Sequence, residues 1–498
     1  MQAQCHSSSH KLDEIQAQLN TLLNLRHSNS LVSLAGSINT EKVYRNFCKG
    51  LFDIGVTAEM IKSKEKEIQN MFKSPNATTN SQIDGNTNAS QSKLPEGSNS
   101  PNLETSPLPT ISTESNKNRL TFPQVLPPVD FLVGSLMVGA AKAGNIKRLK
   151  STLGYVQDIN FMDDTGATAL HEAAYGGYND IVQLLLTKGA SIEATDEDNN
   201  TPLHLAAKCG NTRIVDLLLS KGASIEATNS GNNTPLHLAA LYSHTSTVEL
   251  LLSKGASFEA TNHGNYTPLH LAVVYCDAST VDLLISKGAS IEATNNGNNT
   301  PLHCAAEKRG NTSTVELLLS KGASIEATNE DNDTPLHHAA MHGNTSTVDL
   351  LLSKGASIEG TNKYNETPLQ LAALGGHTST VELLLSKGAS IEAMNKYNYT
   401  PLHLAVRYGR ISTVELLLSK GASIEATNNN GNNTPLHSAA LEGHTSTVEL
   451  LLSKGASIEA TNKDNYTPLQ LARQYNNTKV VKLLETAKAT NSYETVSG

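Results

Sequence analysis

Residues 229–261 read N-S-G-N-N-T-P-L-H-L-A-A-L-Y-S-H-T-S-T-V-E-L-L-L-S-K-G-A-S-F-E-A-T, and close copies of this segment follow one another along the chain. Its motif T-P-L-H, or a near variant, begins at ten threonines. These are Thr168, Thr201, Thr234, Thr267, Thr300, Thr334, Thr367, Thr400, Thr434 and Thr467. Seven of the nine intervals are 33 residues long and two are 34, a period that indicates a solenoid of stacked repeats.

The first half of each copy predicts a short helix. In residues 229–261, Thr234 is a good N-cap, and Pro235 stands at the first helical position, where its missing N–H costs nothing. Leu236, Ala239 and Ala240 then form a narrow apolar stripe. The small alanines favour close approach of a neighbouring helix.

The second half predicts another helix. Ser246 and Glu249 have the spacing of a capping box at its start. Val248 and Leu250–Leu252 supply its apolar face, and Gly255 is a left-handed stop. Helices this short are marginal alone, so they require burial of their apolar faces against the next pair.

The residue two positions before each motif threonine predicts a turn between the pairs. It is Gly166 in the first copy and asparagine in the other nine. Glycine and asparagine are the residues that best tolerate a positive φ. A hairpin finger is therefore expected at every repeat junction.

These residues resemble the ankyrin repeat family. The copies D-E-D-N-N-T-P-L-H-L-A-A-K-C-G (196–210) and T-V-E-L-L-L-S-K-G-A-S-F-E-A (247–260) follow its pattern closely, although asparagine replaces the usual finger glycine and Thr247 replaces an apolar residue. The resemblance implies an all-α ankyrin-repeat solenoid with β-hairpin fingers, ten repeats over 163–490 and a degenerate capping repeat over 131–162. It also implies a groove that binds other proteins and no chemistry in the repeat itself.

The remaining segments differ in composition. Residues 1–73 place Leu12, Ile15, Leu19 and Leu22 on one helical face, which predicts a small helical module that docks a partner or self-associates. Residues 74–130 are rich in Ser, Asn, Thr and Pro and predict a disordered linker. Residues 491–498 are expected to form a C-terminal tail.

Composition argues against several functions. The net charge of −9 disfavours a nucleic-acid surface, and no apolar run is long enough to span a membrane. The five cysteines are odd in number and never spaced C-x-x-C, which favours free thiols in a reducing, cytoplasmic location. No catalytic or phosphate-binding motif occurs, so we expect no enzyme activity and no cofactor.

Histidine and the recurring charges have structural interpretations. Eight of the 17 histidines end the T-P-L-H motif, where a hydrogen bond with the capping threonine is expected rather than a metal site. Gln370 and Gln470 stand at the same place. Lys254, Glu259 and their equivalents recur in nine copies and suggest a solvated, mutually neutralising ladder, with a recognition stripe as the alternative.

Specificity is expected where the copies differ, at the finger tips and after the first helix. Tyrosine and arginine at these places are typical of binding hot spots. The candidate partner-binding residues are Tyr364, Tyr397, Tyr399, Arg407, Tyr408, Lys363, Lys396, Tyr242, Tyr275 and Arg309. We therefore expect a non-enzymatic protein–protein interaction scaffold. The alternative is a regulatory subunit or effector whose N-terminal module acts while the repeats target it.

Overall fold

The computed structural model describes residue 62 and residues 129–275, 278–429 and 431–497. The predicted N-terminal module 1–73 and linker 74–130 therefore lie almost wholly outside the described residues. The chain divides into two compact units. One contains Asn145–Phe161 and the chain up to Ala140, and the other contains Ala141–Gly144 and Met162–Gly498.

The described residues form short helices joined by turns. α5 (Val129–Lys142) and α6 (Ile146–Leu153) fall in the segment expected as a capping repeat. Ten helix pairs follow. They are α7 (Ala169–Gly176) and α8 (Asn179–Thr187); α9 (Pro202–Lys208) and α10 (Thr212–Ser220); α11 (Pro235–Leu241) and α12 (Thr245–Ser253); α13 (Pro268–Ala272) and α14 (Ala278–Ser286); α15 (Pro301–Glu307) and α16 (Thr312–Ser320); α17 (Pro335–Met341) and α18 (Thr345–Ser353); α19 (Pro368–Gly375) and α20 (Thr378–Ser386); α21 (Pro401–Arg407) and α22 (Ile411–Ser419); α23 (Pro435–Glu442) and α24 (Thr445–Ser453); α25 (Pro468–Gln474) and α26 (Thr478–Ser497).

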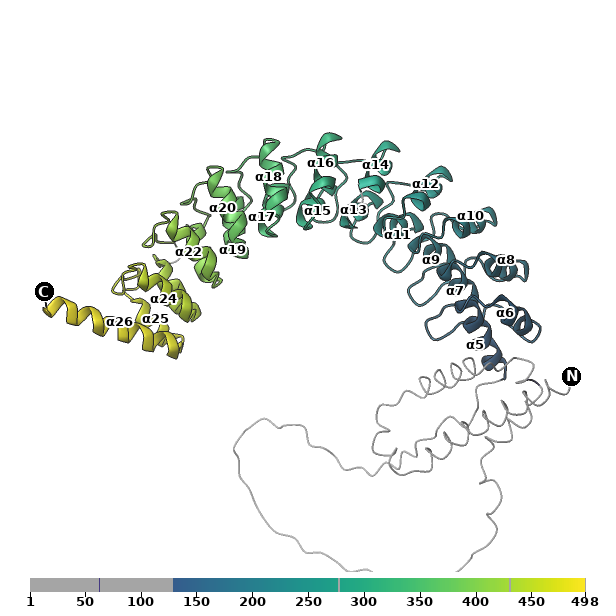
Figure 1. The fold of residues 1–498 in the computed structure, drawn as a ribbon, viewed down its shortest axis with the longest axis horizontal. Helices are drawn as coiled ribbons and strands as arrows, with labels where there is room; N and C mark the ends of the chain where they lie inside the picture. Colours follow the sequence, from purple (N-terminus) through teal and green to yellow (C-terminus); the bar gives the residue numbers. More distant parts are fainter. Residues whose placement is uncertain (1–61, 63–128, 276–277, 430, 498) are drawn as a thin grey trace, which may run out of the picture. The chain divides into compact units, whose positions relative to one another are not determined.

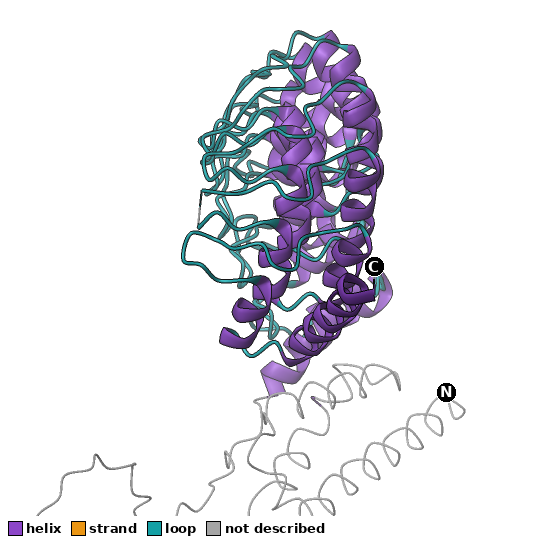
Figure 2. Ribbon diagram, turned by 90° about the vertical axis from the view of Figure 1, so that its left-hand side faces the viewer, coloured by secondary structure: helices purple, strands orange, loops and turns teal. Residues whose placement is uncertain are grey.

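Within the larger unit, the pairs stack in chain order along an arc (Figure 1). The first helix of each pair lies on the inner, concave side and the second helix on the outer side (Figure 1). The loops that join successive pairs project together to one side of the helices (Figure 2). α13 continues as a short 3₁₀ turn, Val273–Tyr275, and α26 runs into the predicted tail 491–498.

The first helices begin as the sequence predicts. The Thr234 side chain accepts a hydrogen bond from the His237 backbone N–H, and Pro235 stands at the first helical turn. The His237 ring accepts in return from the Thr234 N–H at 3.1 Å, which completes a capping box. Leu236, Ala239 and Ala240 are fully buried, so this helix packs through the expected stripe.

The capping box predicted for the second helix is wrong. α12 begins at Thr245, so Ser246 lies inside its first turn and cannot act as the cap. The N-cap is His244, which makes no side-chain bond to its own helix. Its ring instead donates to the Lys208 backbone oxygen of the preceding repeat, 2.9 Å away. This position therefore joins repeats rather than capping a helix.

The apolar face of the second helix is narrower than expected. Val248 and Leu251 are fully buried, whereas Leu250 and Leu252 are only half-buried. Burying one such side chain fully contributes about 1.5–3 kcal/mol. From α12 to α24 each second helix thus buries two apolar residues, whereas α8 and α10 bury three, and these pack together with the inner stripe.

Fingers form at every expected position. All nine finger asparagines have φ between 53° and 60°, and Gly166 has φ 69°. Each finger is closed by a short backbone bond, as from Asn229 N–H to Asn233 oxygen at 3.1 Å, and is joined to the previous one, as from Ser230 N–H to Asp198 oxygen at 2.8 Å. Because so few residues separate the two ends, the expected β-hairpin is a hydrogen-bonded turn, and the described residues hold an isolated bridge, Met162–Thr168, rather than paired strands.

Candidate binding surface

The motif histidines join successive repeats. His237 is completely buried, and its Nδ1 accepts from the Thr234 N–H. Its Nε2 therefore carries the proton and donates to the Tyr266 backbone oxygen in the next finger, 3.0 Å away. Burial lowers the pKa of His237 to about 4, so the ring stays neutral near pH 7. The expected bond with threonine is confirmed, and the second bond was not foreseen.

The recurring charges do not neutralise one another as a ladder. Glu226 accepts from the backbone N–H of Ser257 in the next repeat at 2.8 Å, and its equivalents from Glu193 to Glu425 do the same, whereas Glu459 pairs with Lys488. Lys254 instead pairs with Asp216 of the preceding second helix at 2.8 Å. The ladder hypothesis is wrong because the glutamates from Glu193 to Glu425 accept from backbone N–H groups of the next repeat rather than pairing with the recurring lysines.

Two neighbouring fingers bring lysines and tyrosines together. We call Lys363, Tyr364, Lys396 and Tyr397 the finger cluster. The Lys396 Nζ lies 3.9 Å from the centroid of the Tyr364 ring and 5.0 Å from that of Tyr397. Lys363 lies 5.1 Å from the Tyr364 ring and forms an ion pair with Asp331. Four of the predicted binding residues therefore do gather at one place.

Tyr399 does not belong to the exposed part of this surface. It is only 8% exposed, although it lies two residues from Tyr397 in the same finger. Its ring packs edge-on against His403, and its hydroxyl accepts from Arg407 at 3.3 Å. Tyr399 therefore supports Arg407, which also pairs with Glu442 at 3.6 Å. The expectation that Tyr399 is open to a partner is wrong.

Comparison with known proteins gives the family. The family model described as "Ankyrin repeats (3 copies)" matches residues 136–229, 226–295, 277–362, 359–428 and 423–492. The chain belongs to the ankyrin repeat family. It is also 43% identical over 49 residues to osteoclast-stimulating factor 1 of Bos taurus. That match covers 10% of this chain and 23% of the relative's length, and so reaches only part of each protein.

The tyrosines that follow the inner ankyrin helices differ in their exposure and in their neighbours. Tyr408 is the C-cap of α21 and is 48% exposed. Tyr242 holds the same place after α11, with the Lys208 Nζ 5.8 Å from its ring. The side chain of Tyr275 lies outside the described residues. Arg407, the last residue of α21, and Tyr408, which follows it, are both exposed and so form one predicted surface.

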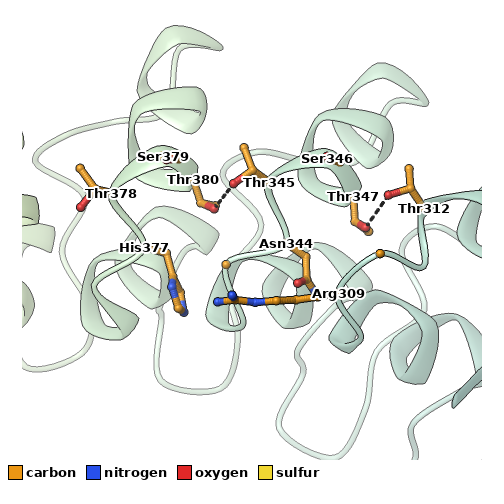
Figure 3. A pocket seen from close by; sticks show the side chains of 12 residues that line it. Arg309, Thr312, Asn344, Thr345, Ser346, Thr347, His377, Thr378, Ser379 and Thr380 are labelled. Atoms are coloured by element: carbon orange, nitrogen blue, oxygen red, sulfur yellow. Dashed lines mark hydrogen bonds between the residues drawn. The ribbon is translucent and has the colours of Figure 1, made fainter. Parts of the chain in front are cut away.

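Arg309 lies in a different part of the ankyrin stack. It lines a depression of about 460 Å³ formed where the helix–turn–helix joints of three repeats meet. Its side chain points toward His377 across the depression (Figure 3), and it donates to the His342 backbone oxygen at 3.4 Å. The other lining residues include the first turns of α16, α18 and α20. Arg309 therefore does not contact the finger cluster.

Threonine hydroxyls line the same depression and bond between repeats. Thr345 lies 2.8 Å from Thr380, and Thr312 lies 3.4 Å from Thr347 (Figure 3). Each bond joins the first residue of one second helix to the third residue of the next. These contacts explain why threonine replaces the apolar residue of the family pattern at Thr247 and its equivalents: the hydroxyl is buried but paired in most repeats.

Some exposed residues were missed by the sequence analysis. Met394 is exposed and stands where the fingers from the second onward otherwise have threonine before them, and the first finger has the exposed Met162 there. This departure is a signal that the sequence does contain. Tyr175 is 53% exposed near the end of the first inner helix. Within the described residues, no group of three His, Cys, Asp or Glu side chains could hold a metal ion, and each helix is too short or too polar to cross a membrane.

Proposed function

We propose that this ankyrin protein is a non-enzymatic scaffold or adaptor that binds a partner protein on its concave, finger-bearing side. The observation that carries the proposal is the finger cluster, where the half-exposed ring of Tyr397 and the ammonium of Lys396 sit side by side on rigid turns. The repeats supply a protein-interaction module, and this cluster supplies a chemically distinct place on it.

Neighbouring groups of the chain contact the Tyr364 and Tyr397 rings. The Tyr397 and Tyr399 centroids are 6.4 Å apart, and the Lys396 ammonium contacts the Tyr364 and Tyr397 rings. A tyrosine that is held in this way contributes contact area with little further loss of rotamer freedom. This favours Tyr397 and the exposed Tyr408 as the residues that hold a partner.

Selection of peptides from a randomised displayed library on the full-length chain tests the proposal. Peptides enriched on the wild type should bind Tyr397→Ala and Tyr408→Ala more weakly by roughly 1–3 kcal/mol. Both side chains are about half exposed, so the helical signal and the urea midpoint should not change. Titration by calorimetry gives the affinities.

Tyr175→Ala is the matched control. Tyr175 is 53% exposed and lies near the end of an inner helix, α7, but it belongs to the first full repeat. Its loss should leave peptide binding unchanged. Equal weakening by the control and by the Tyr397 and Tyr408 variants would contradict the proposal, as would failure to enrich any peptide.

The proposal has three further parts. We place the protein in the cytoplasm because its cysteines suit a reducing compartment. We expect no nucleic-acid partner because residues 131–498 carry 26 basic and 35 acidic residues. Self-association would use residues 1–73, and sedimentation of the full chain beside a chain that lacks this segment tests it.

A further inference from the structure

Lys396 differs from the neighbouring cations because no carboxylate pairs with it. Lys363 pairs with Asp331, and Arg407 pairs with Glu442. In the part of the chain that the structure describes, no Asp or Glu lies within ion-pair distance of the Lys396 Nζ. Lys396 is thus an uncompensated charge on a segment that is acidic as a whole.

The rings position this charge without saturating it. An ammonium has three N–H donors, and the contacts of Lys396 are to the faces of Tyr364 and Tyr397. A cation–π contact at an exposed site contributes about 0.5–1 kcal/mol, less than a charge-assisted hydrogen bond at about 1.5–3 kcal/mol. A carboxylate that approaches from solvent would therefore add to the ring contacts.

The charges on the neighbouring fingers determine which finger an acidic ligand would contact. The finger two before Lys396 carries Glu330, Asp331 and Asp333, which would repel a carboxylate. The Lys396 finger, residues 395–399, and the next finger, residues 428–433, carry no carboxylate, whereas Asp464 stands beside Lys463. An anionic segment is thus disfavoured at the 330–333 finger and favoured at the Lys396 finger.

We propose that the finger cluster binds an acidic segment of the partner protein, with one carboxylate of that segment on Lys396 and an adjacent apolar side chain on the exposed ring of Tyr397. This inference rests on the proposed scaffold function and names the chemistry of the partner. The charge pair would speed encounter, and the ring would slow release.

The test uses peptide libraries against two forms of the full-length chain, wild type and Lys396→Glu. The wild type should enrich peptides rich in Asp and Glu, and Lys396→Glu should enrich peptides rich in Lys and Arg. One acidic peptide enriched on the wild type should then bind Lys396→Met about tenfold more weakly, equivalent to about 1.4 kcal/mol, with a smaller dependence on salt. Lys396→Arg should retain most of the binding.

Lys354→Met is the control, because Lys354 is an exposed lysine that pairs with Glu316 on the outer helices at 3.6 Å. It should not change binding. The inference is overturned if both library selections yield peptides of the same charge, if Lys354→Met weakens binding as much as Lys396→Met, or if a single-stranded DNA oligonucleotide binds Lys396 more tightly than the peptides. Peptides that need Tyr397 but not Lys396 would overturn the acidic partner alone, whereas no enriched peptide would overturn the scaffold proposal too.

Discussion

The Gln370 Nε2 lies 2.7 Å from the Tyr399 backbone oxygen in the next finger, and there it replaces the bond that histidine makes in eight other repeats. The Gln370 Oε1 accepts from the Thr367 N–H at 2.9 Å, as the histidine Nδ1 does elsewhere. An amide can make both bonds at any pH. A histidine can make them only while its Nδ1 is unprotonated.

We therefore predict that acid destabilises the solenoid through its motif histidines. Burial lowers the pKa of His403 to about 4, against 6.5 for an ordinary histidine. The unfolded chain thus binds more protons between these values, and stability that is fully present above pH 6.5 is lost as the pH falls toward 4. His403→Gln should reduce this loss by about 1–3 kcal/mol while changing stability little at pH 7. Urea unfolding at several pH values, followed by circular dichroism, measures it.

His263→Gln is the control for acid sensitivity, because His263 is exposed on a finger. This variant should lose as much stability in acid as the wild type. If His403→Gln also follows the wild type, the motif histidines do not control the acid response.

The threonine bonds between second helices predict a stabilising substitution. Thr447 is buried, and its hydroxyl has no partner in the described structure. The residue one helix earlier, at the place of Thr345 in the Thr345–Thr380 bond, is Ile411. Ile411→Thr should restore the bond and add about 0.5–1.5 kcal/mol of stability.

Ile411→Val separates the hydroxyl from the change in shape. Valine is also β-branched and has nearly the shape of threonine, but it cannot donate to Thr447. Ile411 is itself partly exposed, so trimming it should alter burial little. Equal urea midpoints for the Thr and Val variants would show that the missing hydroxyl is not limiting.

Burial along the second helix predicts an uneven response to truncation. Leu318 is fully buried in α16, whereas its neighbour Leu317 is half-buried. Leu318→Ala should cost about 2–5 kcal/mol because it removes buried methyl groups and leaves a cavity. Leu317→Ala should cost roughly 1 kcal/mol. Urea unfolding of the two variants checks the difference, and equal losses would contradict the packing described here.

Short-range sequence signals predicted the helices and turns of the repeats, because every copy carries the same signals. The motif Thr and Pro start a helix, and the finger Asn takes a positive φ, through interactions that lie within a few residues of sequence. The pairing of Thr245 with Thr280 could not be read in this way, since its partners belong to different repeats. That Ile411 stands where Thr447 would need a hydroxyl partner became clear only once the threonine bonds between repeats were known.

The candidate surface was only partly predictable for the same reason. Tyr397 and Tyr399 stand two residues apart in one finger and look equivalent in sequence. Tyr399 is covered because Arg407 and His403 of the following helix pack against it, whereas nothing comparable covers Tyr397 in the described structure. Side-chain exposure on a finger depends on the helix beneath it, which residue type alone does not reveal.

The finger backbone gives the last prediction. Asn332 has φ 57°, in the left-handed region, and its N–H donates to the Asn329 oxygen at 3.0 Å to close the turn. Asn332→Val should destabilise the solenoid by about 1–3 kcal/mol, because a β-branched residue is strained at this φ. Asn332→Gly keeps the turn without that strain and should be neutral or slightly stabilising. Thermal unfolding of the two variants beside the wild type measures the difference, and matching melting temperatures for Val and Gly would mean that the finger is not held in the left-handed conformation.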